Sequence, residues 1–364
     1  MTDTEKFLYA ERDYYKKTAL RLRAELEDRD LGNIALHKQY EKLQEMYDNV
    51  INSFCWRATG PVRHLSDMLR GNNAAEETAA EEAAAEETVA ETACETAPEE
   101  AALDGAPLIS ILIPSRDHWR DLYLCLESLF AVTDYKNYEV LILENGSAEP
   151  ETFAYYDRLT REHENVRILT WDSGFNYSAI NNFGARQARG DCLLLLNNDT
   201  EFFYPQWLTE MLVGLQEDSA GAVGAVLLHE DGTVQHLGMS VTREIPNLHV
   251  LRDKTPRTVR ETLPEERFSE FDAVTGACLL LRREVWEQLG GLDESFTVTY
   301  NDVDLCLRLR ALGYRCLCAR RALLYHYDCR TRGLDSSEEN SARARAEEGR
   351  FLARHFPDKN TGEE

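Results

Sequence analysis

Hydrophobic and polar positions follow two different patterns along this chain. From residue 5 to residue 53 there is no proline, and apolar side chains recur at alternating spacings of four and three. That spacing is typical of a coiled-coil seam, so a coiled-coil helix is predicted for residues 1–54, with a single amphipathic helix packed on its own domain as the alternative. The seam positions are Tyr15, Ala19, Leu22, Leu26, Leu36, Tyr40, Leu43, Tyr47 and Val50.

Beyond residue 107 short apolar runs alternate with stretches of helical length. This alternation predicts an α/β fold for residues 107–335, with a mostly parallel sheet flanked by helices. The predicted strands are 108–114, 138–143, 166–170 and 192–196, and the predicted helices are 122–130, 153–164 and 177–189.

One apolar run ends abruptly in polar residues. Cys192–Leu196 carries four consecutive leucines, which predicts a strand buried on both faces in the middle of a parallel sheet. Asn197, Asn198 and Asp199 follow directly. Because ligands bind beyond the carboxyl ends of strands in open α/β sheets, Asp199 is a candidate ligand for a hard cation such as Mg²⁺, held against a diphosphate. The alternative is a polar strand-to-helix turn in which Asp199 or Thr200 caps the next helix.

Three further segments surround the predicted α/β domain. Residues 55–72 contain an aromatic and basic cluster with Trp56 and Arg57, which favours a docking segment. Residues 73–106 are an acidic Ala/Glu low-complexity stretch with little to bury, which predicts a solvated linker. Residues 336–364 are expected to form an amphipathic helix and a tail.

Composition narrows the class of protein. The chain has 364 residues and a formal net charge of -25, which argues against non-specific nucleic-acid binding. Its nine cysteines lack a paired framework, as in a reducing compartment, and buried structural cysteines are favoured over a zinc site near Cys316 and Cys318. No apolar run of 18 residues is present. We expect a cytoplasmic protein with, at most, peripheral contact at the inner face of the cytoplasmic membrane.

Polar residues follow three of the predicted strands. They are Ser115–Asp117, Glu144–Ser147 and Asn197–Asp199. Carboxylates and amides that converge at one sheet edge can accept hydrogen bonds from a base and a ribose, which predicts a nucleotide pocket. A dinucleotide or P-loop site is disfavoured, because no Gly-x-Gly-x-x-Gly or Walker lysine follows the first strand.

Several motifs between about Leu108 and Gly333 resemble those of one known family. They read ISILIPSRD, YEVLILENGS, FNYSAINNFGARQARGDCLLLLNNDTE, FDAVTGACLLLRREVWEQLGGLDESF, NDVDLCLRLRALGY and LYHYDCRTRG. Together they are similar to family 2 glycosyltransferases of the GT-A fold, of the rhamnosyltransferase-like type found in bacterial O-antigen and surface-polysaccharide synthesis. The segment around Trp56 and Arg57 also resembles one that often adjoins such domains.

The resemblance implies an inverting transfer that uses a nucleotide-sugar donor, UDP- or dTDP-linked, and a divalent cation, Mg²⁺ or Mn²⁺. The acceptor would be a saccharide or a lipid-linked glycan. Asp199 and His326 match the family's metal-binding positions, and a purely structural His326 is the alternative. The implied donor-binding residues are Pro114, Ser115, Asp117, Glu144, Asn181, Asn197, Asn198, Arg330 and Arg332. Glu144 stands where the family usually has an Asp, and Asn197 replaces the first acid of its Asp-x-Asp motif.

Asp302 matches the family's acceptor-side base, which takes a proton from the attacking hydroxyl group. The alternative for Asp302 is a helix N-cap. Asn301 stands where a Glu is commoner, and Asp304 is expected to support the site or the helix N-terminus. The resemblance implies acceptor-proximal positions at Gly276, Ala277, Trp286 and Asn301.

Two other functions are alternatives to a glycosyltransferase. Because Asn197 and Asn301 depart from the family pattern, a non-catalytic scaffold that binds nucleotide-sugar or glycan is the principal alternative. A sugar nucleotidyltransferase would need a Gly- and Arg-rich loop after the first strand, which Ser115–Asp117 does not supply. The predicted coiled coil would make the protein a homo-oligomer or tether it to an assembly.

Overall fold

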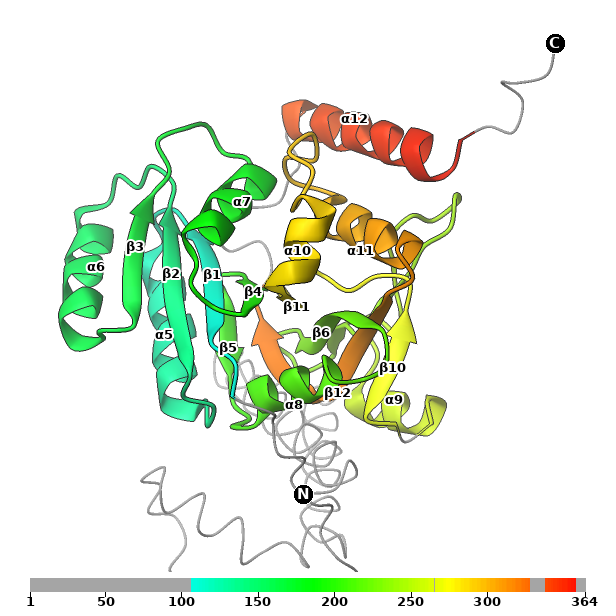
Figure 1. Cartoon of the computed structure of the whole chain (residues 1–364), viewed down its shortest axis with the longest axis horizontal. Helices are drawn as coiled ribbons and strands as arrows, with labels where there is room; N and C mark the ends of the chain where they lie inside the picture. The colour runs from blue at the N-terminus through cyan, green and yellow to red at the C-terminus, as the bar shows by residue number, and fades with distance from the viewer. Residues whose placement is uncertain (1–105, 265, 328–337, 358–364) are drawn as a thin grey trace, which may run out of the picture. The chain divides into compact units, whose positions relative to one another are not determined.

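The computed structural model describes residues 106–264, 266–327 and 338–357 (Figure 1). The chain divides into two compact units, Met1–Ala102 and Leu103–Glu364, and only the second contains described residues. The predicted coiled coil, the Trp56–Arg57 segment and most of the acidic linker therefore lie outside the described residues, and their structures stay predictions.

One half of the central sheet is parallel and contains the first four strands. These are β1 (Ile109–Ser115), β2 (Tyr138–Glu144), β3 (Val166–Thr170) and β4 (Cys192–Leu196). They lie in the order β4-β1-β2-β3, and each neighbouring pair is parallel. Apolar runs form these strands, and β2 and β4 are buried along their whole length. The four predicted strands and their parallel pairing are confirmed.

The other half of the sheet is mixed. It continues from β4 through β11 (Cys278–Arg282), β6 (Ala220–Leu228), β12 (Arg315–His326) and β10 (Phe268–Phe271). β11 is antiparallel to both β4 and β6, and β6 is parallel to β12. β5 (Thr200–Phe202) pairs with β12, and β7 (Val234–His236) pairs with β6. β8 (Met239–Ser240) and β9 (Leu248–His249) form a separate small sheet.

Helices pack around the sheet at both halves (Figure 1). In the parallel half, α7 contacts β1 and β2, and α6 contacts β3; in the mixed half, α8 contacts β6 and β12. The remaining described helices join or cover the strands that follow. The bounds are α5 Trp119–Val132, α6 Pro150–Glu162, α7 Tyr177–Gln187, α8 Trp207–Gly214, α9 Pro256–Thr262, α10 Arg283–Leu289, α11 Asn301–Ala311 and α12 Glu338–His355.

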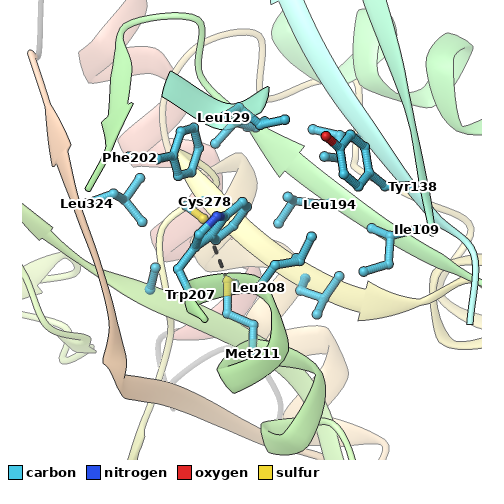
Figure 2. Packing of buried hydrophobic residues seen from close by; sticks show 14 of the residues in the cluster. Ile109, Leu129, Tyr138, Leu194, Phe202, Trp207, Leu208, Met211, Cys278 and Leu324 are labelled. Atoms are coloured by element: carbon cyan, nitrogen blue, oxygen red, sulfur yellow. Dashed lines mark hydrogen bonds between the residues drawn. The ribbon is translucent and has the colours of Figure 1, made fainter. Parts of the chain in front are cut away.

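The core joins the two halves of the sheet. Trp207 on α8 is fully buried, and Figure 2 shows it among Phe202, Met211, Cys278 and Leu324. Its indole Nε1–H donates to Thr133 Oγ1 at 3.0 Å, so the polar atom of this large side chain is satisfied inside the core. Burial of such residues ties α8 to strands of both halves.

Cysteines in the described residues are structural. Cys306, Cys316 and Cys318 are fully buried, and no described cysteine forms a disulfide. Burial raises the pKa of the Cys318 thiol to about 12, which keeps it protonated at neutral pH. The predicted burial of these cysteines is therefore confirmed.

Two features of the leucine strand differ from prediction. β4 lies where the parallel and mixed halves meet, since it is parallel to β1 but antiparallel to β11. The polar residues after it do not lead to a helix: Thr200 begins β5, which pairs with the end of β12. The alternative in which Asp199 or Thr200 caps a following helix is wrong.

Candidate active site

Three separate chain segments meet beyond the carboxyl end of β4. The backbone N–H of Asn197 donates to the carbonyl of Ala277 at 3.0 Å, which brings the turn before β11 against the end of β4. The carbonyl of Asp199 accepts from the N–H of Tyr327 at 2.9 Å, which brings the end of β12 to the same place. The polar residues that follow the leucine strand are thus held by backbone contacts to the turn before β11 and to the end of β12.

Asp199 and His326 form the centre of this junction. Both are buried, and Asp199 Oδ1 lies 3.2 Å from His326 Nε2. The same ring nitrogen lies 3.1 Å from Asn197 Nδ2. A carboxylate oxygen and an imidazole nitrogen at this separation are suited to share one divalent cation.

Gln235 on β7 determines which nitrogen of His326 carries the proton. Its amide Nε2–H donates to the backbone carbonyl of His326 at 3.2 Å, and its Oε1 lies 2.5 Å from His326 Nδ1. An amide oriented to donate to the carbonyl presents its oxygen to Nδ1, so Nδ1 carries a hydrogen and donates it. Nε2 then presents its lone pair toward Asp199 and Asn197, the form in which histidine binds a metal.

Asp302 occupies the first turn of α11, as its second residue. Its Oδ2 accepts from the N–H of Gly276 at 2.9 Å, and its Oδ1 accepts from the N–H of Val303 at 2.8 Å. Tyr177 Oη donates to the carbonyl of Gly276 at 3.0 Å, so the Gly276 residue is held on both sides. The N-cap of α11 is Tyr300, not Asp302. The alternative of Asp302 as an N-cap is therefore wrong.

A polar cavity of about 170 Å³ connects these groups. Asp302, Asn197 and His326 all line it, although Asn197 precedes the other two by more than 100 residues in the chain. Gly276, Ala277 and Asn301 line it as well. A base candidate, a metal-ligand candidate and the predicted acceptor-proximal glycine therefore share one cavity.

Part of the cavity wall comes from residues that the sequence analysis did not single out. Gln235, His236, His249 and Arg252 line it from the region of β7 and β9. His236 is fully buried, and its Nδ1 lies 3.1 Å from His249 Nδ1. Burial and neighbouring positive groups hold the pKa of His236 well below its usual range. No motif marks these residues; β7 reaches the site through its pairing with β6, and β9 is held by its pairing with β8.

The candidate nucleotide-binding residues at β1 and β2 form a second cluster. Glu144 is buried, and its carboxylate accepts hydrogen bonds from Ser147 and from Tyr156 Oη. Asp117 Oδ1 accepts from the N–H groups of Ala148 and Glu149. Burial by itself raises the pKa of Asp117, but these backbone hydrogen bonds outweigh it and lower the pKa. Both carboxylates thus fix the loop after β2, and their contact with a nucleotide stays a prediction.

The remaining predicted site residues lie in several environments. Pro114 and Ser115 end β1, and Asn198 is buried beside Asp199. Asn181 is buried on α7, where its Nδ2 donates to the carbonyl of Tyr177. Trp286 is buried on α10 and is absent from the described lining of the cavity. Arg330 and Arg332 lie outside the described residues. The roles assigned to these positions stay predictions.

Residues 110–290 match the family described as Glycosyl transferase family 2. The motifs quoted above fall largely in this interval, and Asp302 and His326 follow it. Residues 110–290 thus form a domain of this glycosyltransferase family, and the described structure has the GT-A fold, as the sequence resemblance predicted.

Similar proteins include an O-antigen biosynthesis protein and a rhamnosyltransferase. The chain is 41% identical over 238 residues to the O-antigen biosynthesis protein RfbC of Myxococcus xanthus, covering 65% of this chain and 18% of that protein. It is 38% identical over 250 residues to an uncharacterized protein, y4gI, of Sinorhizobium fredii, covering 67% of this chain and 27% of that protein. It is 26% identical over 266 residues to the N-acetylglucosaminyl-diphospho-decaprenol L-rhamnosyltransferase of Mycobacterium tuberculosis, covering 66% of this chain and 81% of that enzyme. The chain thus spans about a quarter or less of the first two relatives.

Solved structures support the fold. GalNAc-T7 with UDP, GalNAc and Mn²⁺ superposes with a TM-score of 0.52 at 16% identity, covering 64% of this chain and 46% of that one. The mannosyltransferase PcManGT from Pyrobaculum calidifontis, in complex with GDP-Man and Mn²⁺, superposes with a TM-score of 0.51 at 15% identity. The match covers 72% of this chain and 68% of that one. Within the described residues, no helix is both long and apolar enough to cross a membrane.

Proposed function

We propose that this protein is an inverting, metal-dependent glycosyltransferase that moves a sugar from a nucleoside-diphosphate donor to a hydroxyl group of a saccharide or lipid-linked glycan. The observation that carries the proposal is the shared cavity: Asp302 and His326 line the same space beyond the carboxyl ends of β4 and β12. Ligands of open α/β folds bind at this edge of the sheet.

Asp199 and His326 are the residues that would hold the cation. They provide one carboxylate oxygen and one imidazole nitrogen, 3.2 Å apart, with the imidazole oriented by Gln235. Among the described residues no cluster of three or more His, Cys, Asp or Glu side chains is suited to a metal ion. Two protein ligands fit a cation whose other positions are filled by water and substrate phosphate. Mg²⁺ or Mn²⁺ bound there would neutralise charge on the departing nucleoside diphosphate.

Asp302 would act as the general base. Its carboxylate is held by two backbone N–H groups and faces the cavity that would receive the acceptor. The acceptor hydroxyl gives its proton to Asp302 while its oxygen forms a bond to C1 of the sugar. The bond between C1 and the diphosphate oxygen breaks, and its electron pair leaves with the nucleoside diphosphate. A single displacement of this kind inverts the configuration at C1.

The donor would extend from the cavity toward the ends of β1 and β2. The resemblance implies base recognition at Glu144 and a ribose contact at Asn197, with Asp117 among the nucleotide-sugar-binding residues. GalNAc-T7 and the mannosyltransferase bind UDP and GDP-Man respectively, so their names do not select one base for this chain. UDP- and dTDP-linked sugars are the proposed donors, because the motif resemblance is to rhamnosyltransferase-like enzymes.

Donor hydrolysis by the purified full-length chain tests the proposal. A panel of UDP-, dTDP- and GDP-sugars is incubated with Mn²⁺ and, separately, with chelator, and release of nucleoside diphosphate is measured. We expect slow release from one donor class, abolished by chelator, because water replaces the acceptor in the cavity. Release that is equally fast with chelator would overturn the metal dependence.

The same panel separates the enzyme from a nucleotide-sugar or glycan-binding scaffold. A scaffold would bind a nucleotide sugar in calorimetry and yet release no nucleoside diphosphate, even when saccharide acceptors are added. Anomeric configuration of the transferred sugar, read by NMR of the product, then tests inversion.

A further inference from the structure

The C-terminal helix α12 contacts the chain on both sides of Asp302. Residues 297–304 connect the end of the loop after α10 to the first turn of α11, and α12 makes polar or ring contacts with Thr297, Thr299, Tyr300 and Asp304 in this segment. In Figure 1 α12 is drawn above α11, and hydrogen bonds from Arg354 and His355 to Asp304 join the two helices. We infer that α12 positions residues 297–304, the catalytic segment, and that Glu347 is the principal positioning residue. The inference rests on the proposed role of Asp302.

Glu347 is a fully buried carboxylate whose oxygens are both occupied by this segment. Oε1 accepts from the backbone N–H of Thr297 at 2.9 Å and from its hydroxyl group at 2.5 Å. Oε2 accepts from the N–H of Thr299 at 2.7 Å, from the Thr299 hydroxyl at 2.7 Å and from the N–H of Val298 at 3.3 Å. Three consecutive N–H groups directed at one anion form an anion-binding nest.

This arrangement determines the conformation of the segment. A buried carboxylate is stable only when its oxygens are hydrogen-bonded, and the N–H groups of residues 297–299 would otherwise lack these partners. The bonds that satisfy Glu347 are therefore the same bonds that hold the backbone of residues 297–299.

Phe351, one helical turn beyond Glu347, makes the second contact. Its ring stacks on Tyr300 with centroids 4.8 Å apart and an interplanar angle of 24°. Tyr300 has a φ of 63°, in the left-handed region that is costly for a residue with a side chain. Ring packing against the fully buried Phe351 supports this conformation immediately before Asn301 and Asp302.

The third contact lies after Asp302. Asp304 is fully buried, and its Oδ1 accepts from Arg354 Nη1 and His355 Nε2, each at 2.8 Å. The contacts come from positions 347, 351, 354 and 355 of α12. Residues spaced by three or four positions lie on the same face of a helix, so one face of α12 makes all three contacts. That face attaches to the segment before and after Asp302.

A general base must lie within hydrogen-bond distance of the acceptor hydroxyl group in order to take its proton. A displacement of about 1 Å costs on the order of 100-fold in rate. The bonds of Glu347 to residues 297–299 therefore affect turnover through Asp302, without touching the substrate.

Glu347→Gln in the full-length chain tests the inference, with Glu348→Gln as the matched control. Glu348 is the adjacent, partly exposed acid, so both variants lose the same charge. In Glu347→Gln an amide NH₂ group replaces one carboxylate oxygen. It cannot accept hydrogen bonds from the N–H groups that it then faces. We expect the amides of residues 297–299 to exchange hydrogen roughly tenfold faster, with little change in the central strands, and no change in the control. Mass spectrometry of peptides covering residues 296–304 measures this exchange.

Turnover is measured with the nucleotide sugar that the wild-type protein hydrolyses. We expect kcat to fall roughly 100-fold, while KM for the donor and the Kd for Mn²⁺ stay within about twofold of wild type. Thr299→Val, which removes one hydroxyl contact and keeps the carboxylate, gives a smaller change in the same direction. It serves also as the second variant if Glu347→Gln does not fold.

Two results would overturn the inference. One is unchanged exchange at residues 297–299 in both Glu347→Gln and Thr299→Val. The other is faster exchange there with wild-type kcat, which would separate the segment from catalysis. If the wild-type protein hydrolyses no donor, the proposed function fails, and the exchange result still decides whether Glu347 holds the segment.

Discussion

At the scale of single residues, the candidate base is held by backbone groups from two parts of the chain. Asp302 accepts from the N–H of Gly276 and from that of Val303. A Cβ added to Gly276 would lie 3.2 Å from Tyr177 Oη and 3.5 Å from Asp302 Cβ. Glycine at this position therefore keeps the approach to the carboxylate open.

Asp302→Asn should separate binding from transfer. The amide cannot take the acceptor proton, so we expect transfer to fall by roughly 100-fold to 10,000-fold, while donor affinity stays within about twofold. Product formation with a responsive acceptor and calorimetry with the donor measure the two quantities. Asp157→Asn, at an exposed position of α6, is the control and should transfer normally. Normal turnover in Asp302→Asn would remove Asp302 from the mechanism.

Gln235→Leu should weaken metal binding without removing a metal ligand. Without the Gln235 oxygen the Nδ1–H group of His326 loses its acceptor. The tautomer that leaves the Nε2 lone pair available to the cation is then no longer favoured. We expect the Kd for Mn²⁺ to rise roughly 10-fold to 100-fold, measured by electron paramagnetic resonance titration without nucleotide sugar.

The matched control for that measurement is Gln216→Leu, a change at an exposed glutamine. It should bind Mn²⁺ with wild-type affinity. Equal affinities in Gln235→Leu and wild type would show that the amide does not prepare His326 for the metal.

The motifs identified Asp199, Asp302 and His326 because their residue types and flanking patterns match the family. They did not identify Gln235 or Glu347. Gln235 acts through a contact 91 residues distant in sequence, and Glu347 through contacts about 50 residues distant. A single sequence contains no local pattern that pairs such positions.

At the scale of helices and strands, the Glu347 carboxylate links α12 to the catalytic segment. Its contribution to the stability of the folded protein depends on pH. Burial alone would raise the pKa of Glu347, but hydrogen bonds from Thr297 and Thr299 outweigh burial and lower the pKa. A carboxyl group with a lowered folded-state pKa contributes stability that is fully present above its ordinary pKa. That contribution is lost as pH falls through the folded-state pKa.

We therefore expect Glu347→Gln to be less stable than wild type by about 1–3 kcal/mol at neutral pH. The difference should shrink as the pH falls below 4.5, the ordinary pKa of this carboxyl group, because protonated Glu347 then resembles Gln. Urea unfolding at a series of pH values measures the free energies. A difference that stays constant down to acid unfolding would contradict this assignment.

Strands with strong apolar runs were predicted closely. The third and fourth predicted strands match β3 and β4 in extent, and α12 lies within the predicted C-terminal segment. None of the predicted elements falls between Phe202 and Val274, where the structure has α8, α9 and β6–β10. Several of these strands are only two to four residues long, so periodicity has too few positions to be recognised.

At the scale of the whole molecule, the chain combines a family 2 glycosyltransferase domain with a preceding segment of about 100 residues. The heptad spacing of residues 1–54 predicts oligomerisation. We expect the full chain to sediment as a dimer or larger oligomer, and the fragment Leu103–Glu364 to sediment as a folded monomer. Sedimentation equilibrium measures both masses. A monomeric full chain would rule out the coiled coil and favour the single amphipathic helix.

The sequence by itself determined the α/β class, the four parallel strands β1–β4, the family and the residue types of the site. These follow from local runs and motifs, because burial selects apolar residues and chemistry selects carboxylates and histidine. Only the tertiary structure decided that β4 lies between a parallel and an antiparallel neighbour and that Asp302 and His326 share one cavity with Asn197. It also decided that Glu347 holds the segment before Asp302. Strand order and helix docking depend on contacts between distant residues, and these are formed only when the whole chain packs.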